Sequence, residues 1–267
     1  MNKDYRATVL SLGAGVQSSA LLLACERGDL PFKPDFAVFA DTKNEPDDVY
    51  HWLNFLETIT SIPIIRISKG NLAEDMLAKG SRFASIPFFM ANSDGELGLL
   101  RRQCTKEYKL EPVIKAIRFR LGVEYRKRMK GRVRVLIGIS RDEAHRMKPS
   151  RTPWIDNTYP LVDAGWRRET CKAYVIKETN RTPPRSACFM CPYHNDYEWA
   201  NMQKNQPEAF DQAIEFDRRI RSGPKIGQIK GVPFIHRSLQ PLGEIDFTSP
   251  KEQVDFFGNE CEGICGV

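Results

Sequence analysis

The sequence predicts an α/β protein: a mainly parallel sheet with helices on both faces, followed by a less regular C-terminal extension. The main observation is that short apolar runs, of the length of buried strands, alternate with longer runs of helical periodicity. A second is the length of 267 residues, which at about 150 residues per domain allows one large domain or two small ones. Strands that alternate with helices in this way build a parallel sheet between two helical layers.

The expected elements follow in a regular order. An apolar strand at 8–12 leads into a glycine loop, and helical periodicity through 19–25 stops at Gly28. The other expected elements are a strand at 36–40, a helix at 46–58, a strand at 62–67, a helix at 111–120, a strand at 133–139, a helix at 169–178 and a helical region at 196–221. We therefore expect a nucleotide-binding domain with a cysteine site at 1–195, and a helical extension with a cysteine-containing tail at 196–267.

Composition excludes several classes of protein. The mean hydropathy is −0.44, and no apolar run approaches the ~20 residues that span a bilayer, so no membrane segment is expected. No signal peptide is expected either, because the N-terminus leads straight into a strand. Seven cysteines are too few for a disulfide scaffold and leave at least one unpaired. These features predict a cytoplasmic protein whose cysteines bind metal or do chemistry.

The net charge of +6 is unevenly distributed. Between Lys115 and Arg134 there are nine Lys and Arg residues and a single acid, Glu124, so the rest of the chain is slightly acidic. Such a segment is typical of a solvated basic helix and loop. It would also suit contact with a polyanion such as tRNA or another nucleic acid, and charge alone does not separate the two interpretations.

Residues 11–19 combine a strand end, a glycine loop and a helix start, which together suit anion binding. Backbone N–H groups of such a loop and of the first helical turn point at the ligand. The loop is neither a Walker loop nor a complete GxGxxG fingerprint. Its glycines allow close backbone approach, and three polar side chains offer donors. We predict that it binds a nucleotide through Ser11, Gly13, Ala14, Gly15, Gln17, Ser18 and Ser19.

The end of the second expected strand supports this prediction. Asp41 and Thr42 come directly after its apolar run. In open parallel sheets, ligands bind outside the carboxyl ends of the strands, where these two residues and the glycine loop are expected to meet. We therefore assign Asp41 and Thr42 to the same nucleotide site.

Three cysteines form a candidate metal set. Cys188 and Cys191 have the two-residue spacing that grips one metal or cluster from a tight turn. Cys104 lies far earlier, shortly after Arg101 and Arg102, whose charge would stabilise thiolates. Three thiolates would hold a 4Fe-4S cluster and leave one iron for another ligand. The alternatives are unrelated buried cysteines and a zinc site completed by His194.

In their order along the chain, these motifs resemble those of the PP-loop superfamily of adenine nucleotide α-hydrolase-like proteins, whose fold is Rossmann-like. Within it, the pattern is most similar to the sulfonucleotide reductases, which act on phosphoadenosine phosphosulfate or adenosine phosphosulfate. The resemblance runs from about Ser11 to Cys191. It rests on the glycine loop, Phe39–Pro46, Cys104–Pro112, Gly138–Glu143, Tyr159–Leu161 and Cys188–Cys191.

Two departures from the superfamily patterns bear on the reaction. ATP-splitting members carry an acid in the glycine loop, where this chain has Val16-Gln17, and its absence favours a sulfonucleotide over ATP. Adenosine-phosphosulfate reductases carry a tandem Cys-Cys at the position of Cys104, where this chain has Gln103-Cys104. The fourth iron of a cluster would then be open, as in cluster-dependent tRNA thiolases, or be bound by Cys171 or a tail cysteine.

The resemblance also implies roles for a second loop and for the tail. Gly138 and Arg141 match the glycine–arginine substrate loop of the reductases, so Gly138 is expected to contact the nucleotide and Arg141 to hold its anionic groups. The reductases carry a catalytic cysteine in a C-terminal Glu-Cys-Gly segment, which Glu260-Cys261 resembles. Cys261 is therefore expected to be the nucleophile. Cys265 is an additional cysteine, expected to act as a resolving thiol or a ligand.

The function that the resemblance implies is that of an oxidoreductase of sulfur metabolism. The tail thiolate would attack the sulfur of a sulfonucleotide, and a thiol reductant such as thioredoxin would then release sulfite. The first alternative is an ATP- and cluster-dependent thiolase of tRNA or another nucleic acid, bound through the segment 115–134. The second is an inactive nucleotide-binding module that acts through a partner.

Overall fold

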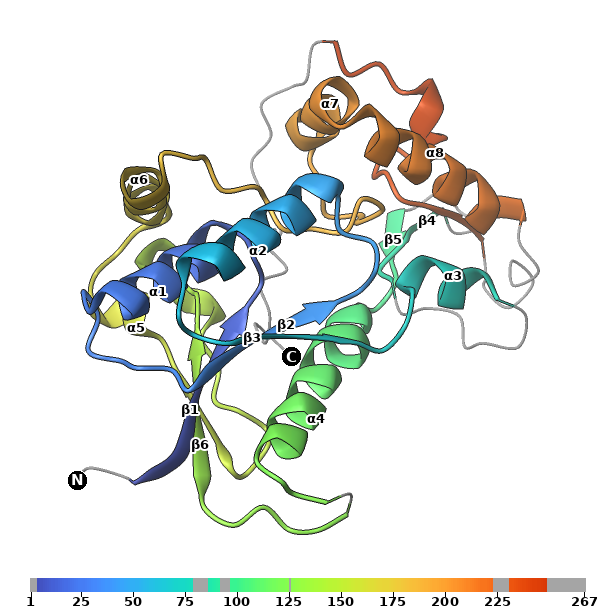
Figure 1. Ribbon diagram of the computed structural model, residues 1–267. Coiled ribbons are helices and arrows are strands. Elements are labelled where there is room, and N and C mark those ends of the chain that lie inside the picture. The colour runs from blue at the N-terminus through green and yellow to red at the C-terminus, as the bar shows by residue number, and fades with distance from the viewer. Residues whose placement is uncertain (1–3, 79–85, 92–96, 125, 223–230, 249–267) are drawn as a thin grey trace.

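A five-stranded, entirely parallel sheet forms the centre of the molecule (Figure 1). The computed structural model describes residues 4–78, 86–91, 97–124, 126–222 and 231–248. In the sheet order β3-β2-β1-β6-β7, the strands are β3 (Ile64–Ser68), β2 (Phe36–Asp41), β1 (Tyr5–Leu12), β6 (Arg132–Ile137) and β7 (Ile155–Thr158). The prediction of an α/β fold with a parallel sheet is confirmed, and β7 is a strand that the sequence did not predict.

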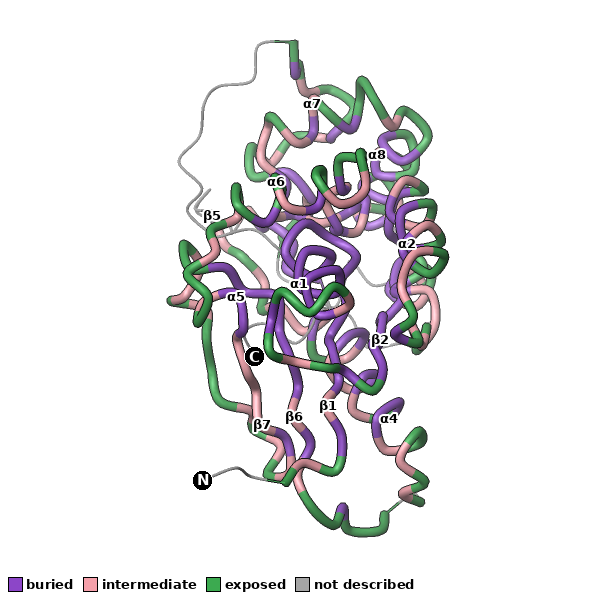
Figure 2. The backbone as a smooth tube through the Cα atoms, turned by 60° about the vertical axis from the view of Figure 1, so that its left-hand side comes forward, coloured by how far each residue is buried: buried purple, intermediate pink, exposed green. Residues whose placement is uncertain are grey.

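Helices cover both faces of this sheet, as the alternation of side chains along β1 requires. Leu10 and Leu12 face one side and pack with the buried side chains of α1 (Val16–Arg27), α2 (Asp47–Ile59) and α6 (Arg168–Thr179). Ala7 and Val9 face the other side and pack with α4 (Glu111–Arg120). In Figure 2 the central strands and α1 form the continuous buried interior.

The local sequence explains where α1 ends and which face of α2 is buried. The positive φ of Gly28, 82°, ends α1 in the left-handed conformation that glycine adopts without steric cost. Helix α1 is buried from Val16 to Cys25 because α2 and α6 enclose it. Helix α2 buries the one face that its sequence predicts: Val49, Trp52, Leu53 and Leu56.

A second lobe, which the sequence did not predict as a sheet, packs beside the first. Its three-stranded antiparallel sheet has the order β5-β4-β8, formed by β5 (Leu97–Leu99), β4 (Phe89–Ala91) and β8 (Val232–Phe234). Around it lie α3 (Leu72–Leu77), α7 (Asp196–Asn205) and α8 (Pro207–Ser222). One apolar core joins these elements, from Leu72 to Phe247.

The helical region expected at 196–221 is divided into two helices. Helix α7 ends at Asn205 and α8 begins at Pro207. Proline lacks the N–H that an unbroken helix needs and disfavours helical backbone at the residue before it. Gln206, with φ −139° and ψ 57°, is that residue.

Short helical segments complete the described chain. They are the π-helix η1 (Thr105–Leu110), the 3-10 helix η2 (Arg141–Arg146), α5 (Pro160–Asp163) and the 3-10 helix η4 (Leu242–Glu244). Within the described ranges, no helix combines the length and the apolar character needed to cross a membrane.

Candidate functional site

The glycine loop connects β1 to α1 at a topological switch point of the sheet. The chain leaves β1 toward β2 and β3 on one side, and later returns to β6 and β7 on the other. Open α/β sheets bind ligands in the crevice outside the carboxyl ends of the strands at such a point. The structure therefore places residues 11–19, and the segment that follows β6, where a nucleotide is expected.

Close backbone packing fixes the shape of the loop. Ala14 adopts a left-handed φ of 59°, which is uncommon for a residue with a side chain. Gly138, directly after β6, lies against the first turn of α1: a Cβ there would be 2.8 Å from Ser18 N and 2.9 Å from Ser18 Cα. The glycine is thus required by the approach of two backbones.

The three polar side chains expected to donate to a ligand have partners within the protein. Ser18 Oγ accepts from Gly13 N at 3.2 Å, and Ser19 Oγ accepts from the indole N–H of Trp52 at 2.8 Å. The Gln17 amide oxygen accepts from Arg168 at 2.7 Å. These side chains hold the loop in position, so the backbone N–H groups are the donors best placed for an anion.

One polar side chain of the loop differs from the others. Ser11, near the end of β1, is only 3% exposed, and its hydroxyl has no hydrogen-bond partner among the described residues. A buried hydroxyl without a partner is costly, and in native proteins it commonly marks a place that a ligand or a water completes. Ser11 is therefore the loop side chain best suited to meet a ligand.

Asp41 and Thr42, at the end of β2, point to different partners. The Asp41 carboxylate accepts from Tyr50 Oη at 2.8 Å and from Lys43 N at 2.7 Å. Burial, together with this carboxylate, raises the pKa of Tyr50, so its phenol donates in the neutral form. Thr42 Oγ1 instead lies 3.2 Å from Cys188 Sγ. Thr42 thus links the sheet edge that carries the glycine loop to the cysteines.

Cationic groups lie near the loop. Arg141 begins η2 and is exposed, and its guanidinium has no partner among the described residues. Arg168, at the start of α6, donates to Gln17, and its backbone N–H donates to Asp142 Oδ1 at 3.1 Å. Burial opposes ionisation of Asp142, but hydrogen bonds from Ser140 and this N–H outweigh it and lower its pKa. The Asp142 carboxylate therefore stays charged and fixes the start of α6.

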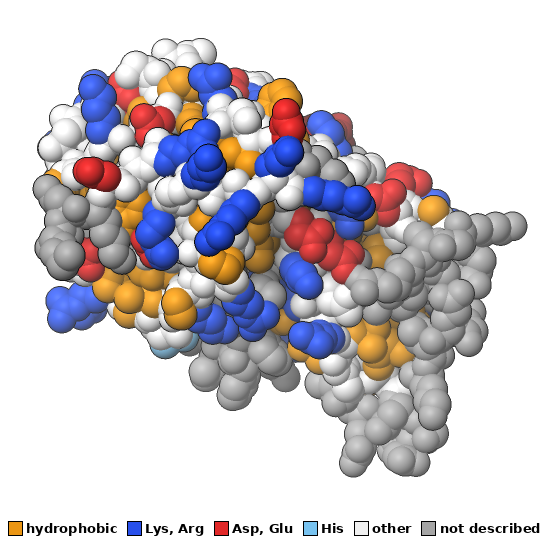
Figure 3. All heavy atoms as spheres, turned by 90° about the horizontal axis from the view of Figure 1, so that it is seen from below, with side chains coloured by type: hydrophobic (Ala, Val, Ile, Leu, Met, Phe, Trp, Pro, Cys, Tyr) orange, Lys and Arg blue, Asp and Glu red, His pale blue; other side chains and the backbone are white. Residues whose placement is uncertain are grey.

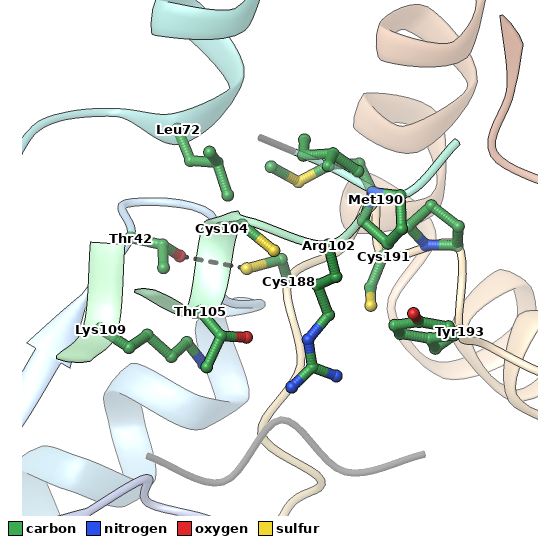
Figure 4. A pocket seen from close by; sticks show the side chains of 13 residues that line it. Thr42, Leu72, Arg102, Cys104, Thr105, Lys109, Cys188, Met190, Cys191 and Tyr193 are labelled. Carbon is green, nitrogen blue, oxygen red and sulfur yellow. Dashed lines mark hydrogen bonds between the residues drawn. The ribbon is translucent and has the colours of Figure 1, made fainter. Parts of the chain in front are cut away.

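The three cysteines of the predicted metal set line one pocket. Figure 4 shows Cys104 before η1, Cys188 beside Thr42, and Cys191 nearer to Tyr193. Arg102 enters the same pocket, with its guanidinium carbon 5.5 Å from the centre of the Tyr193 ring. The pocket joins segments far apart in the chain: the end of β2, residues 102–109 and residues 188–193.

A buried ion pair lies beneath Cys188. Lys109 Nζ is 3.2 Å from Glu45 Oε1, and both side chains are almost fully buried. Ser186 Oγ donates to the other oxygen of Glu45 at 3.2 Å. Burial and the charge of Glu45 together raise the pKa of Cys188 well above the usual thiol value. Without a bound metal, this raised pKa favours the neutral thiol of Cys188.

His194 fixes the turn that carries the cysteine pair. Its Nε2 lies 3.1 Å from the carbonyl oxygen of Cys188, and its Nδ1 lies 3.0 Å from Arg185 NH1. Burial lowers the pKa of His194, although Glu198 opposes the shift. A neutral ring that donates from Nε2 and accepts at Nδ1 satisfies both contacts. In this arrangement His194 positions the cysteine turn, and both of its ring nitrogens are occupied by protein groups.

The pocket has the sulfur donors that an iron–sulfur cluster needs, but its cavity is too small to hold one. Three sulfurs from two chain segments are the donor type that such clusters use. The cavity volume, however, is about 30 Å³, which holds about two water molecules. Among the described residues, no group of three or more His, Cys, Asp or Glu is arranged to hold a metal ion. A cluster would need a wider cavity than these side chains leave.

The remaining cysteines fall into two groups. Cys25 and Cys171 are buried in α1 and α6, and burial raises the pKa of Cys25 to about 12. Cys261 and Cys265, the predicted nucleophile and its companion, lie outside the described residues.

Several residues that support the site were not predicted from the sequence. Glu45 and Lys109 stood within recognised motifs, but nothing in the sequence pairs them. Arg168 carried no signal at all, because its contact with Gln17 joins residues 151 positions apart. Such contacts depend on tertiary packing, which periodicity and spacing do not encode.

Comparison of the chain with protein-family models gives no match, and neither does comparison with curated proteins.

Proposed function

We propose that the protein is a sulfur-transfer enzyme that binds an adenine nucleotide, and that it reduces a sulfonucleotide. The observation that carries this proposal is the distance of 3.2 Å between Cys188 Sγ and Thr42 Oγ1. It puts thiols at the end of the strand next to the glycine loop, since β2 pairs with β1 and neighbouring strands are about 4.8 Å apart. A nucleotide on the loop would carry its reactive sulfur toward these thiols.

The binding half of the site would use main-chain and side-chain groups in different ways. Loop N–H groups and the N-terminus of α1 would hold the phosphates, because both present positive partial charge. The Ser11 hydroxyl would donate to the same group. Arg141, whose guanidinium is exposed beside the switch point, would neutralise the remaining negative charge.

The nucleophile would come from the tail. Cys188 is disfavoured because its raised pKa keeps it protonated, and the thiolate is the reactive form. In the proposed reaction the Cys261 thiolate forms a bond to the sulfur of the sulfonucleotide. The bond from that sulfur to the phosphate oxygen breaks, and the adenine nucleotide leaves with the electron pair.

The second half of the reaction regenerates the enzyme. A dithiol reductant such as thioredoxin attacks Sγ of the resulting S-sulfocysteine, which releases sulfite and forms a mixed disulfide. The second thiol of the reductant then resolves this disulfide, so the reductant is oxidised and Cys261 becomes a thiol again. If the pocket widened to admit a cluster, Cys104, Cys188 and Cys191 would hold it, and it would tune the electrostatics of the site.

Two assays with protein purified without oxygen test the proposal. Sulfite release from phosphoadenosine phosphosulfate and from adenosine phosphosulfate is measured with thioredoxin as reductant. We expect release from at least one of them and none from the Cys261→Ser variant. The control Cys25→Ser, at a buried cysteine of α1, should release sulfite like the wild type. Pyrophosphate release from ATP with no sulfite from either substrate would contradict the proposal and favour the thiolase.

A further inference from the structure

We propose that the end of α4 and the loop after it, residues 115–124 and 126–130, form a surface that binds single-stranded nucleic acid. This basic surface precedes β6 and so lies at the amino end of the sheet, opposite the glycine loop and the cysteine pocket. It is independent of the proposed reaction.

The structure separates the cations of this region into two groups. Arg118 donates to the carbonyl oxygens of Glu124 and Lys127 at 2.8 and 2.7 Å, so it braces the loop. Arg132 pairs with Asp156, and the guanidinium carbon of Arg134 lies 4.2 Å from the centre of the Tyr5 ring. Exposed cations of this region include Lys115, Arg120, Lys127, Arg128 and Lys130.

An exposed aromatic ring lies within this basic surface. Phe119 is 87% exposed and sits on the last turn of α4, directly before Arg120. A ring this exposed contributes almost nothing to the apolar core of the described fold, so the core does not explain why an aromatic residue stands here. Single-stranded nucleic acids bind through the combination found here, in which cations follow the backbone and an aromatic ring stacks on a base.

The wider surface agrees with this interpretation. Figure 3 views the molecule from below, the end at which the α4–β6 connection lies in Figure 1. Lys and Arg side chains gather across the middle of this face, with apolar side chains between them, and a compact acidic group lies to one side.

Fluorescence anisotropy with labelled oligothymidylate and oligouridylate tests the surface on the full chain. The test variant combines Lys115→Gln, Arg120→Gln, Lys127→Gln and Arg128→Gln. The charge-matched control combines Lys172→Gln, Lys177→Gln, Lys204→Gln and Arg218→Gln, four exposed cations on α6, α7 and α8. We expect the test variant to lose affinity more than tenfold at low salt, and the slope of log K against log[salt] to become shallower by about 3.

A second variant tests the choice of single strands. Phe119→Ala should weaken binding to the single strand by about tenfold and leave the salt slope unchanged, because stacking is not an ionic contact. Binding to a DNA duplex of the same length should be unaffected by it.

Three results would overturn the proposal. The first is no difference between the four-residue variant and its control. The second is equal dependence of duplex and single-strand binding on Phe119. The third is binding of anionic lipid vesicles, but of no oligonucleotide, through the same residues.

Discussion

The glycine loop and the cysteine pocket lie at the same edge of the sheet but are built in different ways. The loop is one continuous stretch whose shape depends on backbone contacts with Gly138. The pocket is assembled from distant segments over the buried pair of Glu45 and Lys109. The geometry of the loop should therefore be disturbed by added side-chain volume, and that of the pocket by a change of charge. Variants that damage one half selectively can test this.

The largest expected effect is on the pocket. Lys109→Met removes the partner of Glu45, a carboxylate that is fully buried, and breaking a buried ion pair in this way costs roughly 3–5 kcal/mol. The free energy of unfolding, measured by urea titration, should fall by that amount. The double variant Glu45→Gln/Lys109→Met should recover most of the loss, because no unpaired charge remains. An equal loss in the double variant would show that the pair is not the source.

The next effect is on the loop. Gly138→Ala places a Cβ 2.8 Å from Ser18 N, so the backbones must separate, at a cost of roughly 1–3 kcal/mol. The affinity of Gly138→Ala for the nucleotide, measured by calorimetry, should fall as well, because the loop no longer keeps its shape. Gly243→Ala is the matched control, because its Cβ would come no closer than 3.4 Å to a flexible Ile214 side chain. Equal losses of stability and affinity in Gly138→Ala and Gly243→Ala would contradict the close packing of Gly138 against Ser18.

Acid should weaken the turn that carries the cysteine pair. Burial lowers the pKa of His194 below its value in the unfolded chain, so the unfolded state gains a proton first as the pH falls. Stability is therefore retained above about pH 6.5 and lost below it, by at most ~1.4 kcal/mol per pH unit for one proton. Unfolding free energies between pH 7 and 5 measure this loss. In His194→Gln the unfolding free energy should depend less steeply on pH. The same steepness as in the wild type would mean that His194 is not the group whose protonation destabilises the fold.

The smallest expected effect is on thiol reactivity. The pKa of Cys188 is raised mainly by burial and next by the negative charge of Glu45. The double variant Glu45→Gln/Lys109→Met removes the second cause without leaving an unpaired buried charge. Because Glu45 outweighs Lys109 in its effect on this pKa, iodoacetamide should alkylate Cys188 faster at pH 8 in the double variant. Mass spectrometry of the peptide that contains Cys188 measures the rate, and the Cys25 peptide is the internal control. An unchanged rate would mean that Glu45 does not influence the thiol.

The sequence predicted the first lobe well because its signals are local. The apolar run of β1, the glycine loop and the buried face of α2 can each be read within about a dozen residues. The second sheet could not be read in this way: β4 and β8 are three residues long, and Phe89 pairs with Phe234. Strands this short have too few positions to establish a period.

The site was predictable in its residue types but not in its contacts. The spacing of Cys188 and Cys191 pointed to a shared turn, and the structure places Cys104 at the same pocket. The polar residues of α1 were interpreted as ligand donors because the sequence did not reveal that Trp52 and Arg168 contact them. Likewise, the raised pKa of Cys188 follows from its burial and from Glu45, which only the fold brings together.

The measurement that tests most directly whether the loop and the pocket form one site is nucleotide protection of the pocket cysteines. The alkylation rates of Cys104 and Cys191 are compared with and without saturating adenosine phosphosulfate, in the wild type and in Gly138→Ala. We predict slower alkylation with the nucleotide in the wild type, and loss of that protection in Gly138→Ala at the same nucleotide concentration. Alkylation that the nucleotide leaves unchanged in the wild type would contradict the account.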